Sequence, residues 1–307
     1  MFCGFIWSPI FDHYYNILEE INRDYNVKQF YIYDFNNNPD IYEKAILKIY
    51  TTDDIDPDKV KNVKLKYMEP YNNKFIYFLF DVNNPTYRTK KKYCTKICID
   101  VENTKKNVRN NYKKYVKNYI HDIIIHTSDN PQQAKDIAKI MKSYNQYKIN
   151  QFINLKTLLK FQYNDVFPNG KFTRIDMLVR AYSIKKYLDD NKYDFSLYKK
   201  MQELRAIYLN CENKQNCEIF KELIKSLSIK YDNLSKIKCV NNFILSDGSH
   251  RLSYCYLKKK IFIPFDLIIN PEKTYCNYDI NWFKERFNLN EIKILENEIK
   301  ILEDYLK

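Results

Sequence analysis

Glycine is almost absent from this chain, which has three glycines in 307 residues. This scarcity excludes the glycine-rich phosphate loops of P-loop NTPases and protein kinases, in which the backbone approaches phosphate too closely for a Cβ. The chain also lacks a run of about 18 uncharged apolar residues, so no membrane-spanning helix is expected. Its start, MFCGFIWSPIFDHYY, has no early basic residue, which is atypical of a signal peptide. Together these absences predict a cytoplasmic protein.

Closely spaced cysteines are missing as well. The eight cysteines are scattered, no C-x-x-C occurs, and none of the four histidines lies at zinc-ligand spacing from a cysteine. This pattern favours free, mostly buried thiols in a reducing compartment over a disulfide framework or a zinc site.

Basic and aromatic residues are abundant. The apolar fraction of 45% predicts a folded core, and the length is sufficient for two domains. The net charge is +13, and residues 84–120 concentrate it, with eleven Lys/Arg against Asp100 and Glu102. This segment should attract a polyanion such as a triphosphate, a glycan phosphate or a nucleic acid. Residues 113–117 interleave lysine with tyrosine, as surfaces that bind single-stranded nucleic acid do. For this part we favour a solvated helix face over such a surface.

The first half alternates short apolar runs with amphipathic stretches. These patterns predict strands at 2–7, 27–35, 74–82 and 122–126, and helices at about 10–22, 41–50 and 101–119. A further helix is expected after Ser128 or Asp129 as N-cap, with Pro131 near its first turn. The order of elements predicts an α+β domain of ferredoxin-like split βαβ topology over residues 1–145.

The second half, residues 146–307, is predicted to be a helix-rich α+β domain. Helices are expected at 152–163, 174–188, 195–209, 217–229 and 252–258, and strands at 243–246 and 261–269. The C-terminal segment has an apolar seam at 3-4-3-4 spacing, formed by Ile292, Leu295, Ile299, Leu302 and Leu306. Two heptads are too few for a sustained coiled coil, so this helix should dock on its own domain. The polar stretch 144–150 is the expected linker.

The segment Asp247-Gly248-Ser249-His250-Arg251 joins a predicted strand to a predicted helix. Gly248 can adopt a positive φ there and lets a ligand approach the backbone. The amides of the first helical turn have no intrahelical acceptor, and His250 and Arg251 add side-chain donors. The segment therefore predicts an anion or phosphate site. The alternative is a capped helix in which Asp247 serves the turn and Arg251 faces solvent.

Residues 243–268, FILSDGSHRLSYCYLKKKIFIPFDLI, resemble the core of the ParB/sulfiredoxin-like superfamily, with its D-G-x-H-R strand-to-helix turn. Its members include nucleotide-dependent partition proteins, the sulfinic-acid repair enzyme and a free-serine kinase, and they use this turn for nucleotide phosphates. The resemblance implies ATP or another nucleotide with Mg²⁺ as cofactor. It implies that Gly248, Ser249, His250 and Arg251 hold the phosphates, that His250 and Arg251 stabilise charge in transfer, and that Asp247 acts as base or metal ligand.

The stretch upstream of this motif has polar candidates that match no member of the superfamily. For each, a solvated helix face is the favoured explanation over a substrate contact. The candidates are Arg174, Asp176, Arg180, Lys200, Gln202 and Arg205.

A second motif, Ile124-Ile125-His126-Thr127-Ser128-Asp129, resembles the active-site strand I-I-H-G-S-D of nucleoside diphosphate kinases, where the histidine carries the phosphoryl group. Arg109 is similar to that family's arginine near the phosphates, and the ferredoxin-like order is that family's fold. Three positions depart from its pattern. Thr127 replaces the glycine, Trp7-Ser8-Pro9 replaces the lysine-proline pair after the first strand, and Ile137 stands where the family has an orienting glutamate.

A phosphohistidine requires a partner that fixes its tautomer and cations that neutralise the phosphoryl oxygens. Because two of these supports are missing at the expected positions, we expect a degenerate nucleotide-binding fold in the first half.

Both resemblances imply phosphate chemistry. The sequence therefore predicts a kinase-like, nucleotide-dependent phosphotransferase that acts on a small molecule or carbohydrate, with direct transfer at the turn formed by residues 247–251. One alternative is a non-enzymatic nucleotide- or nucleic-acid-binding ParB-like protein, in which residues 84–120 contact a nucleic-acid backbone. Another is an interaction module in which both sites are vestigial.

Overall fold

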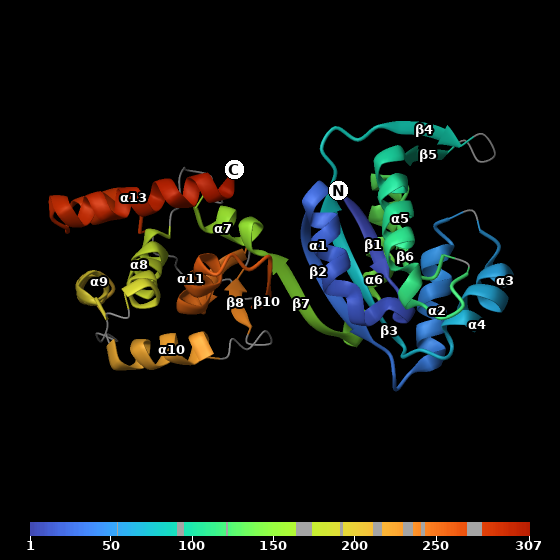
Figure 1. Ribbon diagram of the computed structural model, residues 1–307, viewed down its shortest axis with the longest axis horizontal. Coiled ribbons are helices and arrows are strands. Elements are labelled where there is room, and N and C mark those ends of the chain that lie inside the picture. The colour runs from blue at the N-terminus through green and yellow to red at the C-terminus, as the bar shows by residue number, and fades with distance from the viewer. Residues whose placement is uncertain are drawn as a thin grey trace. The chain divides into compact units, whose positions relative to one another are not determined.

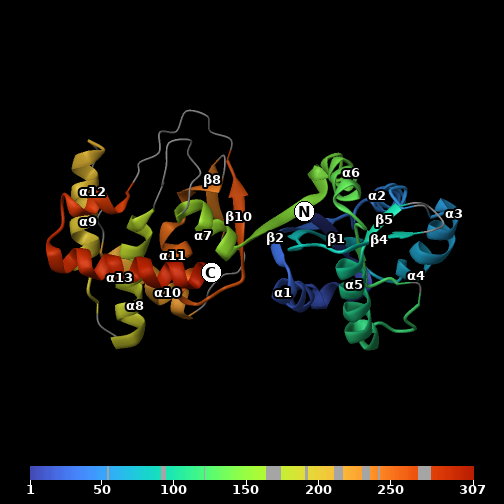
Figure 2. The ribbon, with the colours of Figure 1, turned by 90° about the horizontal axis from the view of Figure 1, so that it is seen from above.

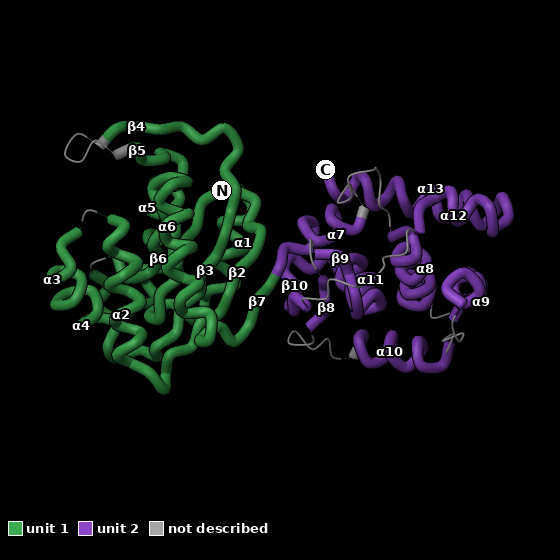
Figure 3. Tube along the Cα trace, turned by 180° about the vertical axis from the view of Figure 1, so that it is seen from behind, with its two compact units in different colours: residues 1–152 green, residues 153–307 purple. Residues whose placement is uncertain are grey.

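The computed structural model describes residues 1–53, 55–90, 95–120, 122–163, 174–190, 193–210, 217–229, 236–240, 243–268 and 278–307. The chain has a mixed α+β fold and divides into two compact units, Met1–Phe152 and Ile153–Lys307 (Figure 3). It passes from one unit to the other inside strand β7 (Lys148–Asn154). The expected linker 144–150 instead forms the 3₁₀ helix η4 (Asn145–Tyr147) and the start of β7. Within the described ranges, no helix is long and apolar enough to cross a membrane.

Unit 1 is built on a sheet with strand order β6-β1-β3-β2-β7 (Figure 1). Its first four members are β6 (Ile125–Thr127), β1 (Phe2–Ile6), β3 (Lys74–Asp81) and β2 (Asn26–Asp34), and each pairs antiparallel with its neighbour. The rings of Phe5, Phe75 and Phe78 fill the core, all with 0% exposure. Gly4 is opposite Phe78, whose ring occupies the space that a Cβ at position 4 would need.

Helices cover both faces of this sheet. Figure 2 shows α1 (Tyr14–Asp24) and α5 (Ile99–Tyr112) on one face, and α2 (Pro39–Tyr50) and α6 (Pro131–Lys142) on the other. The helix expected at 10–22 begins later, because Ser8–His13 forms a 3₁₀ turn, η1, whose residue Ile10 has non-helical backbone angles. The helix expected at 101–119 ends at Tyr112 and is followed by a 3₁₀ turn, η3 (Lys113–Tyr115).

Two parts of unit 1 were not expected from the sequence. The connection after α2 contains the short helix α3 (Pro57–Lys59), the π-helix η2 (Val60–Leu65) and the short helix α4 (Lys66–Met68). In the basic segment, β4 (Tyr87–Lys90) and β5 (Thr95–Cys98) form an antiparallel hairpin. Each strand is only four residues long and is dominated by polar side chains, so the apolar periodicity that indicates a strand is absent.

Unit 2 combines a small sheet with helices. Its strands β10 (Phe262–Leu267), β8 (Ile237–Val240) and β9 (Ile244–Asp247) lie in that order, with β10 parallel and β9 antiparallel to β8. The sequence did not predict β8 or the short helix α12 (Ile280–Lys284). The other helices are α7 (Leu155–Tyr163), α8 (Ile175–Asp190), α9 (Ser196–Tyr208), α10 (Cys217–Ile229), α11 (Ser249–Leu257) and α13 (Leu289–Leu306).

The apolar seam of α13 docks on its own unit, as its spacing predicts. Leu295 and Leu302 are 0% and 1% exposed, and Ile299 packs against the same cores. Asn288 and Glu291 form a capping box that begins the helix. The expected free thiols are also confirmed for the described cysteines: Cys3, Cys98, Cys239 and Cys255 are free and buried, and Cys217 is free and half-buried.

Candidate functional site

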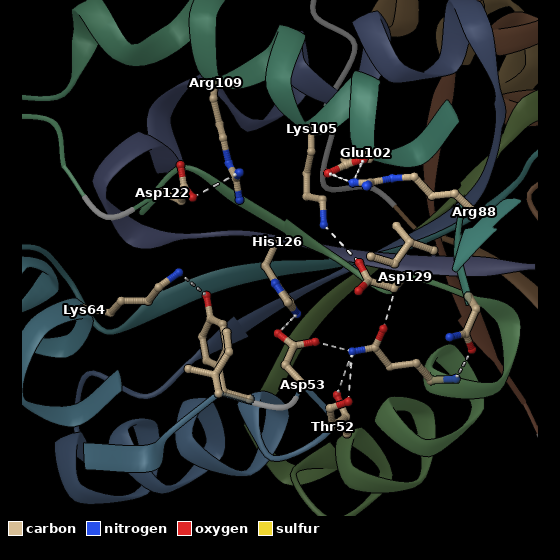
Figure 4. Close-up of a pocket in the computed structure, with 15 residues that line it drawn as sticks. Thr52, Asp53, Lys64, Arg88, Glu102, Lys105, Arg109, Asp122, His126 and Asp129 are labelled. Carbon is tan, nitrogen blue, oxygen red and sulfur yellow. Dashed lines mark hydrogen bonds and ion pairs between the residues drawn. The ribbon is translucent and has the colours of Figure 1, made fainter. Parts of the chain in front are cut away.

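A polar cavity of about 280 Å³ opens in unit 1 beside β6 (Figure 4). Its walls come from the connection after α2, the π-helix η2, the β4–β5 hairpin, α5 and the turn between β6 and α6. Charged side chains dominate the lining. They are Asp53, Lys64, Arg88, Glu102, Lys105, Arg109, Asp122 and Asp129, with His126 among them.

His126 lies on β6, paired with Phe5 of β1, and is 6% exposed. The rings of Phe5, Trp7 and Tyr50 surround its imidazole, with Tyr50 at 4.8 Å between centroids. Burial holds the pKa of His126 well below 6.5, and the charges of Lys105 and Lys64 lower it further. The imidazole is therefore neutral at physiological pH, which is the form that can act as a nucleophile.

Asp53 faces this histidine from the connection after α2. Its Oδ2 lies 3.5 Å from His126 Nε2, a contact of a carboxylate with a neutral imidazole that lacks hydrogen-bond geometry. The sequence led us to expect no orienting carboxylate, because Ile137 occupies the family's glutamate position. In the structure, Ile137 is a core residue of α6 with 0% exposure, and the carboxylate nearest the imidazole is that of Asp53.

Lys64 supplies a cation from the π-helix. Its ammonium donates to the Tyr50 hydroxyl at 3.3 Å and lies 4.8 Å from the centre of the Tyr50 ring. It forms no ion pair with any residue that the structure describes. Burial lowers the pKa of Lys64 to about 8. Lys64 therefore adds a partly desolvated cation to the lining of the cavity.

The remaining cations of the cavity are paired with carboxylates. Arg109, on α5, donates to the Ile125 carbonyl at 3.0 Å and lies 3.2 Å from Asp122. Lys105 lies 3.3 Å from Asp129, and Arg88 binds Glu102 at 2.8 Å. The structure therefore brings together His126 and Arg109, the two residues singled out in this half. Asp53, Lys64 and Lys105 were missed, because no local spacing connects them to the histidine motif.

The turn at 247–251 has the backbone shape that its sequence predicts. Gly248 has φ of 91°, and a Cβ there would collide with Ile237. The first-turn amides of α11 follow directly. Asp247, however, uses one carboxylate oxygen to accept from the Gly248 amide at 2.7 Å, and the other lies 3.6 Å from Arg251. Arg251 also donates to the Lys236 carbonyl at 2.8 Å.

His250 packs into unit 2 rather than standing open at the turn. Its Nε2 lies 3.1 Å from the Tyr198 hydroxyl, and its ring is 4.5 Å from that of Phe220. Burial, followed by the charge of Arg180, lowers the pKa of His250 to about 3. The imidazole is neutral and adds no positive charge to the turn. His250, Arg251 and Asp247 are thus all engaged by protein groups.

The upstream candidates form a buried network, so the solvated-face interpretation is wrong for Asp176 and Arg180, which are 0% and 2% exposed. Arg174 binds Asp176 with two hydrogen bonds, at 2.7 and 2.9 Å, and Arg180 binds it at 2.7 Å. Burial opposes ionisation, but Arg174 and Arg180 hold the pKa of Asp176 below its usual range.

The other three upstream candidates also have protein partners. Arg205 donates to the Tyr278 hydroxyl at 2.9 Å. Lys200 pairs with Glu291 at 2.6 Å, and Gln202 donates to the Tyr198 hydroxyl at 3.0 Å.

A magnesium site was tested against the carboxylates present. In the described ranges, no group of three or more His, Cys, Asp or Glu side chains is placed to hold a metal ion. Mg²⁺ bound with nucleotide phosphates needs only one or two carboxylates. Asp122 and Asp247 are similarly exposed, at 55% and 59%, and each lies near an arginine; of the two, Asp122 lines the unit 1 cavity. Searches against protein-family models, curated proteins and solved structures found no match for this chain.

Proposed function

We propose that this chain is a kinase-like, nucleotide-dependent phosphotransferase whose nucleotide phosphates bind in the unit 1 cavity. The observation that carries the proposal is the surroundings of His126. A neutral imidazole lies 3.5 Å from a carboxylate, Asp53, and the same cavity is lined by Lys64, a lysine that has no ion-pair partner among the described residues. These are the two supports that the motif lacked at its expected positions. The proposal therefore moves the chemistry from the 247–251 turn to unit 1.

The topology of unit 1 supports the same conclusion. Its strand order β6-β1-β3-β2, with every neighbouring pair antiparallel, is the order of a ferredoxin-like split βαβ domain when β6 is counted as the fourth strand. We assign unit 1 to this topology. The helix α5 and the turn before α6 then face the same cavity, which brings Lys105, Arg109 and His126 around one space.

The reaction has two steps. Because Nε2 of His126 faces Asp53, the lone pair of Nδ1 attacks the γ-phosphorus of the nucleotide. An N–P bond forms, the bond from phosphorus to the bridging oxygen breaks, and the nucleoside diphosphate leaves with that electron pair. Lys64, Lys105 and Arg109 neutralise charge on the phosphate oxygens. A hydroxyl of a small molecule or carbohydrate then attacks the phosphorus, the N–P bond breaks, and the hydroxyl proton passes to solvent.

Mg²⁺, when bound with the nucleotide, supplies further charge neutralisation, and Asp122 is the residue that we expect to hold it. Within the chain, the negative charge of Asp53 favours the proton on Nε2 of His126 during the first step. The aromatic wall of Phe5, Trp7 and Tyr50 excludes water from the ring.

The test is incubation with γ-labelled ATP and Mg²⁺. We expect an acid-labile, base-stable label that His126→Ala removes and that His13→Ala retains, since His13 lies on the surface stacked on Tyr115. Nucleotide binding without any label would contradict phosphotransfer through His126. It would favour the non-enzymatic nucleotide-binding alternative.

A second candidate is direct transfer at the 247–251 turn, and one observation favours it. Arg174, Arg180 and Arg205 surround a single carboxylate, Asp176, and the buried Nε of Arg180 has no partner in the described structure. A partly buried surplus of positive charge beside the first turn of α11 favours the binding of an anion there. If Arg205→Gln abolishes stabilisation by ATP and His126→Ala does not, the nucleotide binds in unit 2.

A further inference from the structure

The side chain of Gln133, in the first turn of α6, bridges two walls of the unit 1 cavity and is 8% exposed. Its Oε1 accepts from the backbone amide of Asp129. Its Nε2 donates to Asp53 Oδ1 and, at 3.2 Å, to the Thr52 carbonyl. The other Asp53 oxygen, Oδ2, is the atom 3.5 Å from His126 Nε2. One amide group therefore connects the strand end that follows His126 to the carboxylate that faces it.

This bridge requires both functions of a primary amide. The Asp129 amide is a donor, so the glutamine oxygen must face it, and this fixes the nitrogen toward Asp53. A glutamate at 133 would place a second carboxylate against Asp53, and a leucine would make neither bond. Asp53 is 13% exposed in its side chain, so water competes weakly for these contacts.

We propose that Gln133 is a positioning residue that holds the Asp53 carboxylate 3.5 Å from Nε2 of His126, where its negative charge favours a proton on that nitrogen and leaves Nδ1 for the phosphoryl group. This inference rests on the proposed phosphotransfer function. The tautomer of a histidine is set by the partner of its other nitrogen, and small displacements of a supporting group reduce the rate strongly. Backbone hydrogen bonds hold the turn at residues 51–53, among them Asp53 N–H to the Tyr50 carbonyl at 3.1 Å, and Gln133 adds the contact that fixes the Asp53 carboxylate.

Gln133→Leu tests the proposal, with Gln132→Leu as the matched control. Gln132 is the preceding residue of the same helix turn, is exposed, and contacts Asp136 at 3.2 Å. Two quantities are measured below the melting temperature of every variant. The first is the His126 ring tautomer, read from ¹⁵N chemical shifts in nucleotide-free protein. The second is the rate of His126 labelling by γ-labelled ATP.

We expect Gln133→Leu to convert a single Nε2–H tautomer into a mixture and to slow labelling about tenfold or more, as loss of a supporting hydrogen bond does at other catalytic groups. The apparent KM for ATP should stay within about twofold, because Gln133 supports the histidine and not the phosphate cations. Gln132→Leu should match the wild type in both measurements.

The outcomes separate this inference from the proposed function. If Gln133→Leu keeps the wild-type tautomer and labelling rate, the positioning role is wrong and the phosphotransfer proposal stands. If the wild type takes no label, the proposed function fails, and the tautomer measurement alone decides the role of Gln133. If Gln133→Leu does not fold, Gln133→Glu keeps the size and removes the donor, and a wild-type tautomer in that variant would overturn the inference.

Discussion

Lys64 offers a test of whether the unit 1 cavity binds a ligand, because the structure indicates that this buried lysine lowers the free energy of unfolding. Its ammonium is largely buried against the Tyr50 ring and has no ion pair with the described residues. Burial lowers the pKa of Lys64 from 10.5 to about 8. Between pH 8 and pH 10.5 the unfolded chain holds a proton that the folded chain has lost. The free energy of unfolding therefore rises with pH across this window, and the full penalty is present below pH 8.

Replacing Lys64 with methionine removes this buried charge and keeps the side-chain length. Each unit of pKa shift corresponds to about 1.4 kcal/mol, so we expect Lys64→Met to raise the free energy of unfolding at pH 7 by about 1 to 3 kcal/mol. The same variant should bind ATP about tenfold more weakly or worse, because it lacks a buried cation. A residue that lowers stability and raises affinity is the signature of a ligand site.

The pH dependence adds an independent check. If binding requires the ammonium, wild-type affinity for ATP should fall about fivefold between pH 8 and pH 9, because the protonated fraction of a lysine with a pKa of about 8 falls from about one half to about one eleventh. The affinity of Lys64→Met should be flat over that range. Urea unfolding without ligand gives the stability, and isothermal titration with ATP gives the affinity. Lys59→Met, at an exposed lysine of the neighbouring helix α3, is the control and should change neither. Loss of apo stability in Lys64→Met together with unchanged affinity would refute this reasoning.

Three further predictions concern unit 2. Asp176→Asn should lower the free energy of unfolding by about 3 to 5 kcal/mol, since it leaves buried arginines without their carboxylate, whereas exposed Asp189→Asn on the same helix should be near neutral in urea titrations. The pKa of His250 is about 3 in the folded state, so stability should fall by up to about 1.4 kcal/mol per pH unit as pH drops below 6.5. His250→Phe should reduce that slope by the contribution of one histidine and leave the contribution of the buried His126, and an unchanged slope would contradict the burial of a neutral imidazole at 250. Gly248→Ala should cost about 1 to 3 kcal/mol because φ is 91° there, and a melting temperature equal to that of the wild type would show that the turn has another conformation.

Much of the secondary structure follows from local patterns in the sequence. The helices α8, α9 and α10 and the seam of α13 were predicted from apolar spacing, because a helix buries one face and repeats its contacts every three to four residues. The left-handed turn at Gly248 was predicted for a similarly local reason. The π-helix η2, the β4–β5 hairpin and β8 were missed, because they are short and carry no sustained period.

The sequence by itself singled out His126, through a motif of consecutive residues, and Arg109, through the same resemblance, as candidates for a phosphate site. Only the tertiary structure decided that Asp53 lies beside that histidine, that Lys64 lines the same cavity, and that Gln133 connects Asp129 to Asp53. It also decided that Asp176 and Arg180 form a buried pair and not a solvated face. The reason is that sequence spacing records neighbours along one element. The chemistry of a buried site depends on which distant segments the sheet brings within a few ångströms, and on the desolvation that follows.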